Sequence, residues 1–136
     1  MLYRNICLAL SCVFALSAVQ SSFAQDRAAM ESYACNYVEG KGLDDLMAVA
    51  AKWDKWASEN NPAPYQAYVL TPIFATFEEV PEAVWIGFSP TSAQLGAVAD
   101  TWLSEGGDLI AEFDSVVKCG AHTLGGSRMV KAYENA

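Results

Sequence analysis

The sequence is poor in positive charge. Eight Lys and Arg residues stand against sixteen Asp and Glu residues in a chain of 136, which gives a net charge of −8 at pH 7. A protein that binds nucleic acid gains affinity by replacing phosphate counterions with clustered Lys and Arg. The sequence has no such cluster, so the composition argues against DNA or RNA as a partner.

Residues that hold metals and cofactors are also scarce. His122 is the only histidine, whereas a structural zinc site requires four ligands. A haem iron would need an axial ligand, and His122 lies on an expected strand between Gly120 and Gly125. No glycine-rich phosphate loop follows an expected strand. We therefore predict no metal and no cofactor.

What the sequence has in quantity is apolar surface. Hydrophobic residues make up 53% of the chain, which is enough to offset the entropy of ordering it. The length fits one domain, and no internal repeat or low-complexity stretch interrupts it.

The N-terminus has the pattern of a secretory signal peptide. Arg4 supplies a positive start, an apolar run follows at 6–19, and small residues flank Phe23 before an expected cleavage at Gln25. The apolar run is shorter than the about 20 residues that cross a bilayer.

This pattern sets the expected domain organisation. We predict that residues 1–24 are removed and that residues 25–136 form one periplasmic or secreted domain without a membrane anchor. Two alternatives stay open: an uncleaved anchor, or a lipoprotein attached through Cys12.

Two of the four cysteines, Cys7 and Cys12, lie in the expected signal. The remaining pair, Cys35 and Cys119, predicts a disulfide in an exported protein. Closing a loop of this size stabilises the fold by about 4 kcal/mol in the chain-entropy account. Two free buried thiols and a metal site are the alternatives.

Hydrophobic periodicity divides the expected domain into six elements and predicts an α+β fold. The order β-α-β-β-α-β is the ferredoxin-like pattern, with a four-stranded antiparallel sheet in the order 4-1-3-2 and two helices on one face. Residues 109–113 form at most one further helical turn. In this order the first and last strands are neighbours, which agrees with a bond between Cys35 and Cys119. The strands are expected at 33–38, 65–75, 83–88 and 116–130, and the helices at 43–57 and between Thr91 and Gly106.

This order, its two amphipathic helices and its doubly apolar sheet resemble the dimeric α+β barrel superfamily. The resemblance implies two sheets packed face to face with helices outside. It leaves the activity open, because members include cofactor-independent monooxygenases, haem enzymes, cyclases and ligand binders. Cys35-Asn36-Tyr37, followed by Gly40-Lys41 and by 44–47, also resembles uncharacterised small exported proteins of marine bacteria. That likeness implies a periplasmic setting and no particular activity.

The second expected strand favours a homodimer on physical grounds as well. Tyr68, Leu70 and Phe74 alternate with other apolar residues, so both faces of the strand are apolar. Two helices cover one face, and a second copy would cover the other through an isologous contact. The alternative is a monomer in which residues 125–136 fold back over that face.

Two residues are candidates for proton chemistry. His122 is the only side chain that ordinarily titrates near neutrality. Asp54 falls on the apolar stripe of the first helix, where a carboxylate could face the cleft between helix and sheet. Both have a simpler interpretation, namely that they reach solvent.

Asn36 is a candidate for ligand binding because a buried amide in an apolar strand needs partners. If Cys35 lies opposite Cys119, regular antiparallel pairing places Ser32 opposite His122. Asn36 and His122 would then share one face of the sheet, and the cysteines the other.

Tyr68 and Trp85 are candidates for the wall of a cleft that holds a flat apolar molecule; as alternatives, they belong to the core. The sequence therefore leaves three functions open. The first is an exported protein that binds a small apolar or aromatic molecule without catalysis. The second is a cofactor-independent enzyme acting on such a molecule, and the third an envelope protein-interaction module.

Overall fold

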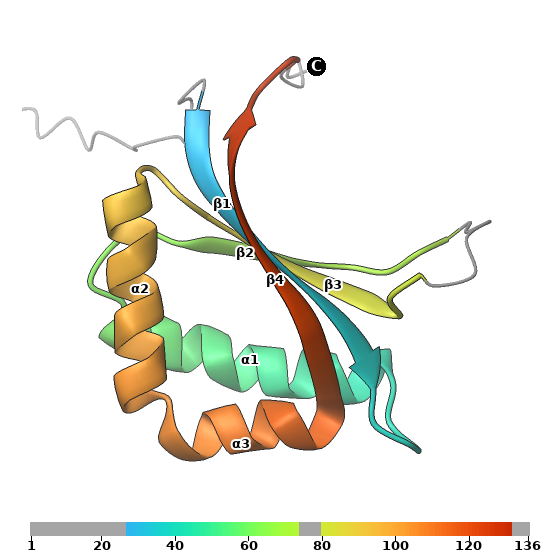
Figure 1. The fold of residues 1–136 in the computed structure, drawn as a ribbon. Helices are drawn as coiled ribbons and strands as arrows, with labels where there is room; N and C mark the ends of the chain where they lie inside the picture. The colour runs from blue at the N-terminus through green and yellow to red at the C-terminus, as the bar shows by residue number, and fades with distance from the viewer. Residues whose placement is uncertain (1–26, 74–79, 132–136) are drawn as a thin grey trace, which may run out of the picture.

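A computed structural model describes residues 27–73 and 80–131 (Figure 1). Four strands and three helices follow one another in the order β1, α1, β2, β3, α2, α3, β4. Their bounds are β1 Arg27–Tyr37, α1 Leu43–Asn60, β2 Gln66–Leu70, β3 Ala83–Ser89, α2 Ser92–Glu105, α3 Gly107–Val116 and β4 Val117–Arg128.

The strands form an antiparallel sheet in the order β2-β3-β1-β4. The α+β class predicted from the sequence is therefore confirmed, and the first and last strands are neighbours. β1 is longer than expected, because it begins at Arg27 rather than at residue 33. β2 is shorter and ends at Leu70, before Pro72, which has no backbone N–H to donate to a ladder.

The prediction of two helices is wrong, because α3 is a full helix of ten residues. Gly106 and Gly107 turn the chain between α2 and α3 instead of ending the helical region. Gly107 has a φ of +40°, and a Cβ on Gly106 would lie 2.6 Å from the carbonyl oxygen of Trp102. After this corner Leu109 and Phe113 recur at helical spacing and pack against the buried core.

Side chains near the first turn fix where each of the two longer helices begins. At the start of α1 the Asp45 carboxylate accepts a hydrogen bond from the backbone N–H of Gly42 at 3.1 Å. At the start of α2 the Thr91 hydroxyl accepts the backbone N–H of Gln94 at 3.2 Å, which is an N-cap.

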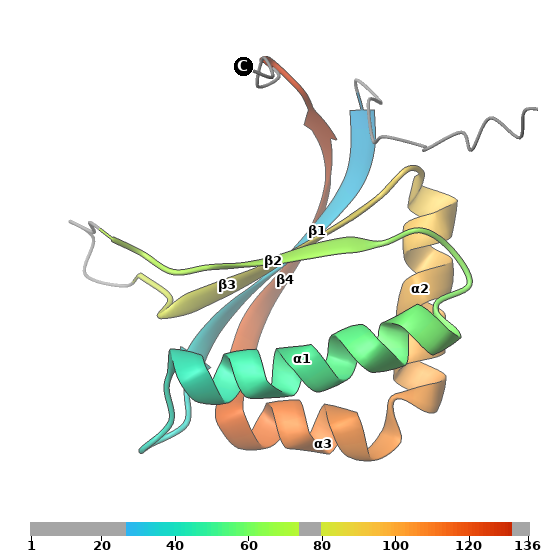
Figure 2. The ribbon, with the colours of Figure 1, turned by 180° about the vertical axis from the view of Figure 1, so that it is seen from behind.

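All three helices lie on one side of the sheet (Figures 1 and 2), and an ion pair between Lys52 and Glu112 joins α1 to α3. The core cluster between these layers consists of Cys35, Leu46, Val49, Ala83, Val116 and Val117. In the described part of the chain, no helix combines the length and hydropathy that a membrane span requires.

β4 runs beside β1 over almost its whole length, and its last pair is Arg27 with Arg128. Residues 125–128 thus belong to the sheet, so the alternative in which the segment 125–136 folds back over the open sheet face is wrong for these residues. The expected signal peptide, its cleavage site and Phe74 lie outside the described residues.

Candidate functional site

A cavity of about 460 Å³ lies between the sheet and the three helices. This volume falls within the about 300–1,000 Å³ that is usual for small-molecule sites. Its walls come from β1, β3 and β4 on one side and from α1, α2 and α3 on the other. Six aromatic side chains line it: Tyr33, Trp53, Tyr65, Trp85, Trp102 and Phe113.

At the centre of the sheet side lies Glu31, a carboxylate with only 7% of its side chain exposed. It accepts hydrogen bonds from the hydroxyl of Tyr65 at 2.6 Å and from that of Tyr33 at 3.3 Å. Nε2 of His122 lies 3.1 Å from the same carboxylate. We call these four residues the Glu31 cluster. Its hydrogen bonds offset much of the cost of burying the carboxylate.

Tyr65 reaches this cluster because Gly87 leaves room for it. Tyr65 precedes β2, whereas Glu31 lies on β1, directly opposite Gly87 of β3. A Cβ on Gly87 would lie 1.8 Å from the Tyr65 hydroxyl oxygen. The phenol ring therefore crosses β3 over a residue without a side chain and reaches the next strand. The indole N–H of Trp85 donates to the same hydroxyl at 3.1 Å.

His122 reaches the cluster because of a β-bulge. Cys35 pairs with Cys119, but Tyr33 pairs with His122, so residues 120–121 of β4 stand opposite Ala34 alone. The expectation that Ser32 would lie opposite His122 is wrong, since Ser32 pairs with Thr123. The extra residue turns His122 to the face of the cysteines, and its ring stacks on Tyr33 with centroids 4.1 Å apart.

Burial and the neighbouring carboxylate keep the two phenols of the cluster protonated. Burial, followed by the charge and hydrogen bond of Glu31, raises the pKa of Tyr33 to about 12. The same causes, again with burial first, raise the pKa of Tyr65 above its ordinary value. Both hydroxyls therefore remain hydrogen-bond donors to Glu31 across the physiological pH range.

The aromatic wall is a continuous chain of edge-to-face contacts. Trp53 contacts Trp85 with ring centroids 4.9 Å apart and Tyr65 at 5.7 Å. Phe113 links Trp85 at 5.8 Å to Trp102 at 6.0 Å. These rings come from α1, α2, α3, β3 and the segment before β2, and they support one another. The wall is thus a preformed apolar surface.

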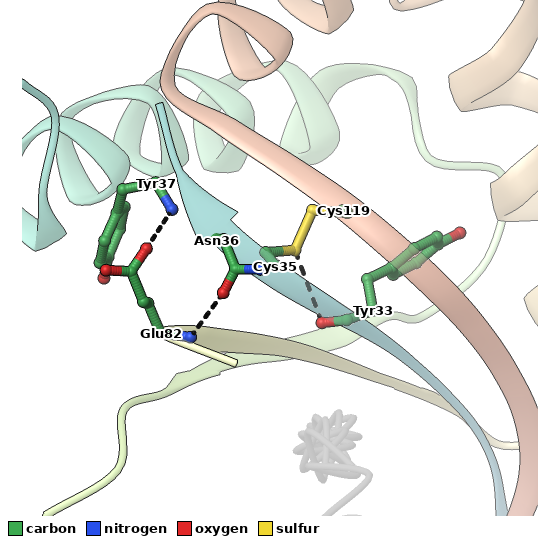
Figure 3. The surroundings of a disulfide bond; sticks show 6 residues. All are labelled: Tyr33, Cys35, Asn36, Tyr37, Glu82 and Cys119. Atoms are coloured by element: carbon green, nitrogen blue, oxygen red, sulfur yellow. Dashed lines mark hydrogen bonds between the residues drawn. A yellow bond between two sulfur atoms is a disulfide. The ribbon is translucent and has the colours of Figure 1, made fainter. Parts of the chain in front are cut away.

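The predicted disulfide is confirmed: Cys35 and Cys119 join β1 to β4 and both line the cavity. Figure 3 shows the bond with its neighbours on β1. Asn36, the next residue, is exposed and accepts the backbone N–H of Glu82 at 3.2 Å, so it does not line the cavity. The Glu82 carboxylate in turn accepts the backbone N–H of Tyr37 at 2.6 Å.

The other residues singled out from the sequence lie in different places. His122 and Trp85 line the cavity. Tyr68 is 48% exposed and lies on the helix-free face of the sheet. Asp54 is exposed on α1 and does not line the cavity. Within residues 27–73 and 80–131, no group of three or more His, Cys, Asp or Glu side chains could hold a metal ion.

Sequence reasoning missed Glu31 because it placed the start of the first strand at residue 33. A signal was nevertheless present, since Ala29, Glu31, Tyr33 and Cys35 alternate along one strand face. A carboxylate at an inward-facing position among apolar residues indicates a functional or structural polar site.

Comparison with known protein families finds no match, and comparison with curated proteins finds none either. Among solved structures, the chain is similar to the solution structure of a hypothetical Arabidopsis thaliana protein. The TM-score is 0.48 and the identity 6%, with 81% of this chain and 94% of the other covered. A likeness at this level carries no argument, so function is argued from the residues of this chain.

Proposed function

We propose that this protein is an exported binding protein that holds a small apolar or aromatic molecule in the cavity beneath the sheet. One observation carries the proposal: a 460 Å³ cavity has walls of aromatic side chains and a hydrogen-bonded polar cluster at its centre. Apolar walls supply affinity, and a few convergent polar groups fix the orientation of the ligand.

Native mass spectrometry of protein purified from the periplasm tests this proposal. We expect an added mass that is released on unfolding. The variant Trp85→Ala removes the central indole of the wall. It should lose the added mass while the disulfide persists. Full retention of the ligand by this variant would place the binding site elsewhere.

The His122–Glu31 pair supports a second function, a cofactor-independent enzyme that removes a proton from the bound molecule. A carboxylate that bonds one ring nitrogen orients the imidazole and stabilises it when it takes up a proton. His122 is 39% exposed, so protons can exchange with solvent. His122→Gln should retain binding but abolish deuterium uptake by the ligand in D₂O. Equal deuterium uptake with the wild type and with His122→Gln would refute proton removal by His122, and only the binding function would stand.

Export and the disulfide belong to the same proposal. A bond between Cys35 and Cys119 is consistent with an oxidising compartment. We propose that the chain is secreted or periplasmic and that N-terminal sequencing of the exported protein begins at Gln25. A start at Met1 in the membrane fraction would refute cleavage.

The element order supports a ferredoxin-like core to which α3 is added, and this core can pair as a dimeric α+β barrel. The helix-free face of the sheet carries a surface of six large apolar side chains that a second copy would cover. Light scattering should give twice the mass of the mature chain, and a single-chain mass that does not change with concentration would refute the dimer. The surface consists of Met30, Tyr68, Leu70, Val84, Ile86 and Phe88.

A further inference from the structure

We propose that the cavity selects an organic cation with an apolar body over neutral and anionic molecules of the same shape. The inference rests on the proposed binding function and names the charge of the ligand. Three properties of the lining residues support it. They carry negative charge, they leave hydrogen-bond acceptors rather than donors free for a ligand, and their aromatic rings attract cations.

The charges that face the cavity are predominantly negative. Glu31 and Asp114 line it, and none of the described lining residues is Lys or Arg. Glu31 is buried on β1, whereas Asp114 is exposed on α3 at the opposite wall. Interactions between charges are stronger where water is excluded. These carboxylates would therefore repel an anionic ligand and attract a cationic one.

The hydrogen bonds within the Glu31 cluster leave acceptors rather than donors for a ligand. Tyr33 and Tyr65 both direct their hydroxyl hydrogens to Glu31, and Trp85 directs its N–H to Tyr65. An ionised carboxylate has about four lone-pair positions, so Glu31 retains acceptor capacity. Asn61, another lining residue, has a buried side-chain oxygen without a hydrogen-bond partner among the described residues. These groups favour a ligand that brings donors or positive charge.

The aromatic wall strengthens the same preference. Trp53, Trp85 and Trp102 line the cavity, and tryptophan is the aromatic side chain that attracts cations most strongly. Rings and a buried carboxylate together form the kind of cage that recognises ammonium groups. Neutral apolar molecules gain only the hydrophobic part of this interaction.

Among the described lining residues, His122 is the group that could bring competing positive charge. A protonated imidazole would pair with Glu31 and reduce the attraction for a cationic ligand. The affinities are therefore also measured with His122→Gln, which cannot carry this charge.

The test uses three probes of nearly identical shape: benzyltrimethylammonium, neopentylbenzene and benzylsulfonate. Calorimetry or ligand-observed NMR with the chain that begins at Gln25 gives the three affinities. We expect the cation to bind about tenfold more tightly than the neutral probe, and the anion to bind most weakly. Glu31→Gln retains the shape of the side chain and should reduce the cation's advantage severalfold, leaving the part that Asp114 and the aromatic rings supply; an unchanged advantage would contradict the role of Glu31.

Two further variants make the result specific. Glu105→Gln removes the same charge from an exposed position outside the cavity and should leave all three affinities unchanged. Asp114→Asn lies on the exposed rim, so it tests the charge argument even where Glu31→Gln fails to fold; it should reduce the cation's advantage by a smaller factor. If only the neutral probe binds well, the charge inference fails and cavity binding stands. If none of the three binds, both fail.

Discussion

Replacing Gly87 with alanine should destabilise the protein through a residue on another strand. The added methyl group would lie 1.8 Å from the hydroxyl oxygen of Tyr65 and 2.3 Å from its Cζ, which is far inside contact distance. The phenol must therefore leave its position above β3. It then loses the 2.6 Å hydrogen bond to Glu31 and its bond from Trp85.

The expected loss follows from these contacts. A hydrogen bond to a charged acceptor contributes about 1.5–3 kcal/mol, and forcing a methyl group into filled space costs about 1–3 kcal/mol. Replacing glycine with alanine also restricts the unfolded chain, and this stabilising effect offsets about 0.4–1 kcal/mol of the loss. We expect the free energy of unfolding of Gly87→Ala to fall by about 2–5 kcal/mol.

Urea unfolding of four proteins measures this effect: the wild type, Gly87→Ala, Tyr65→Ala and the double variant. In the Tyr65→Ala background the methyl group meets no phenol, so Gly87→Ala should be neutral or slightly stabilising. Gly96→Ala is the matched control. Gly96 lies in α2 with no atom within 4 Å of its added Cβ, and the substitution should stabilise by about 0.5–1 kcal/mol. If Gly87→Ala is equally destabilising with and without Tyr65, the crossing phenol is not the cause.

Three further predictions concern the disulfide, the phenols and α1. Replacing Cys35 and Cys119 together by alanine should lower the free energy of unfolding by about 2–4 kcal/mol in urea; two freely alkylated thiols in the oxidised native protein would contradict the bond. Because the folded-state pKa values of Tyr33 and Tyr65 are raised, their contribution to stability is complete below pH 10 and is lost at higher pH, for Tyr33 as the pH rises through its pKa of about 12. Phenolate absorbance should therefore increase later in the folded than in the unfolded protein, and coincident titration curves would disprove this. Asp54→Asn should change stability by less than about 0.5 kcal/mol, because the side chain is exposed; a larger change in thermal unfolding would reveal a hidden partner.

The sequence predicts the helices and strands that carry a local apolar pattern better than it predicts where the helical region ends. The stripes of α1 and α2 and the short apolar strands are local patterns, and they place Cys35 beside Cys119 through a known strand order. α3 escaped prediction because two consecutive glycines usually end a helix. Here Gly107 takes a positive φ and the next helix begins at once.

The candidate site was only partly predictable, because it depends on pairing between distant strands. His122 and Trp85 were singled out by residue type, and both line the cavity. Glu31, the partner of His122, lies in a stretch without strong β propensity, whose strand character comes from pairing with β3 and β4. No sequence pattern reveals that Tyr65 crosses a glycine on another strand, since that contact exists only after the sheet forms.

The bulge in β4 separates two halves of that strand, and each half has its own pairing register with β1. One half is fixed by the disulfide, and the other by the contacts of His122 with Tyr33 and Glu31. Deleting one residue at 120–121 would leave the partners of Cys119 and His122 unchanged, because only the extra residue is lost. Short insertions and deletions here can thus alter the local twist of the sheet, and with it the width of the cavity, without exchanging inward and outward side chains. This position gives the fold a place where evolution or design can adjust the sheet by changing chain length alone.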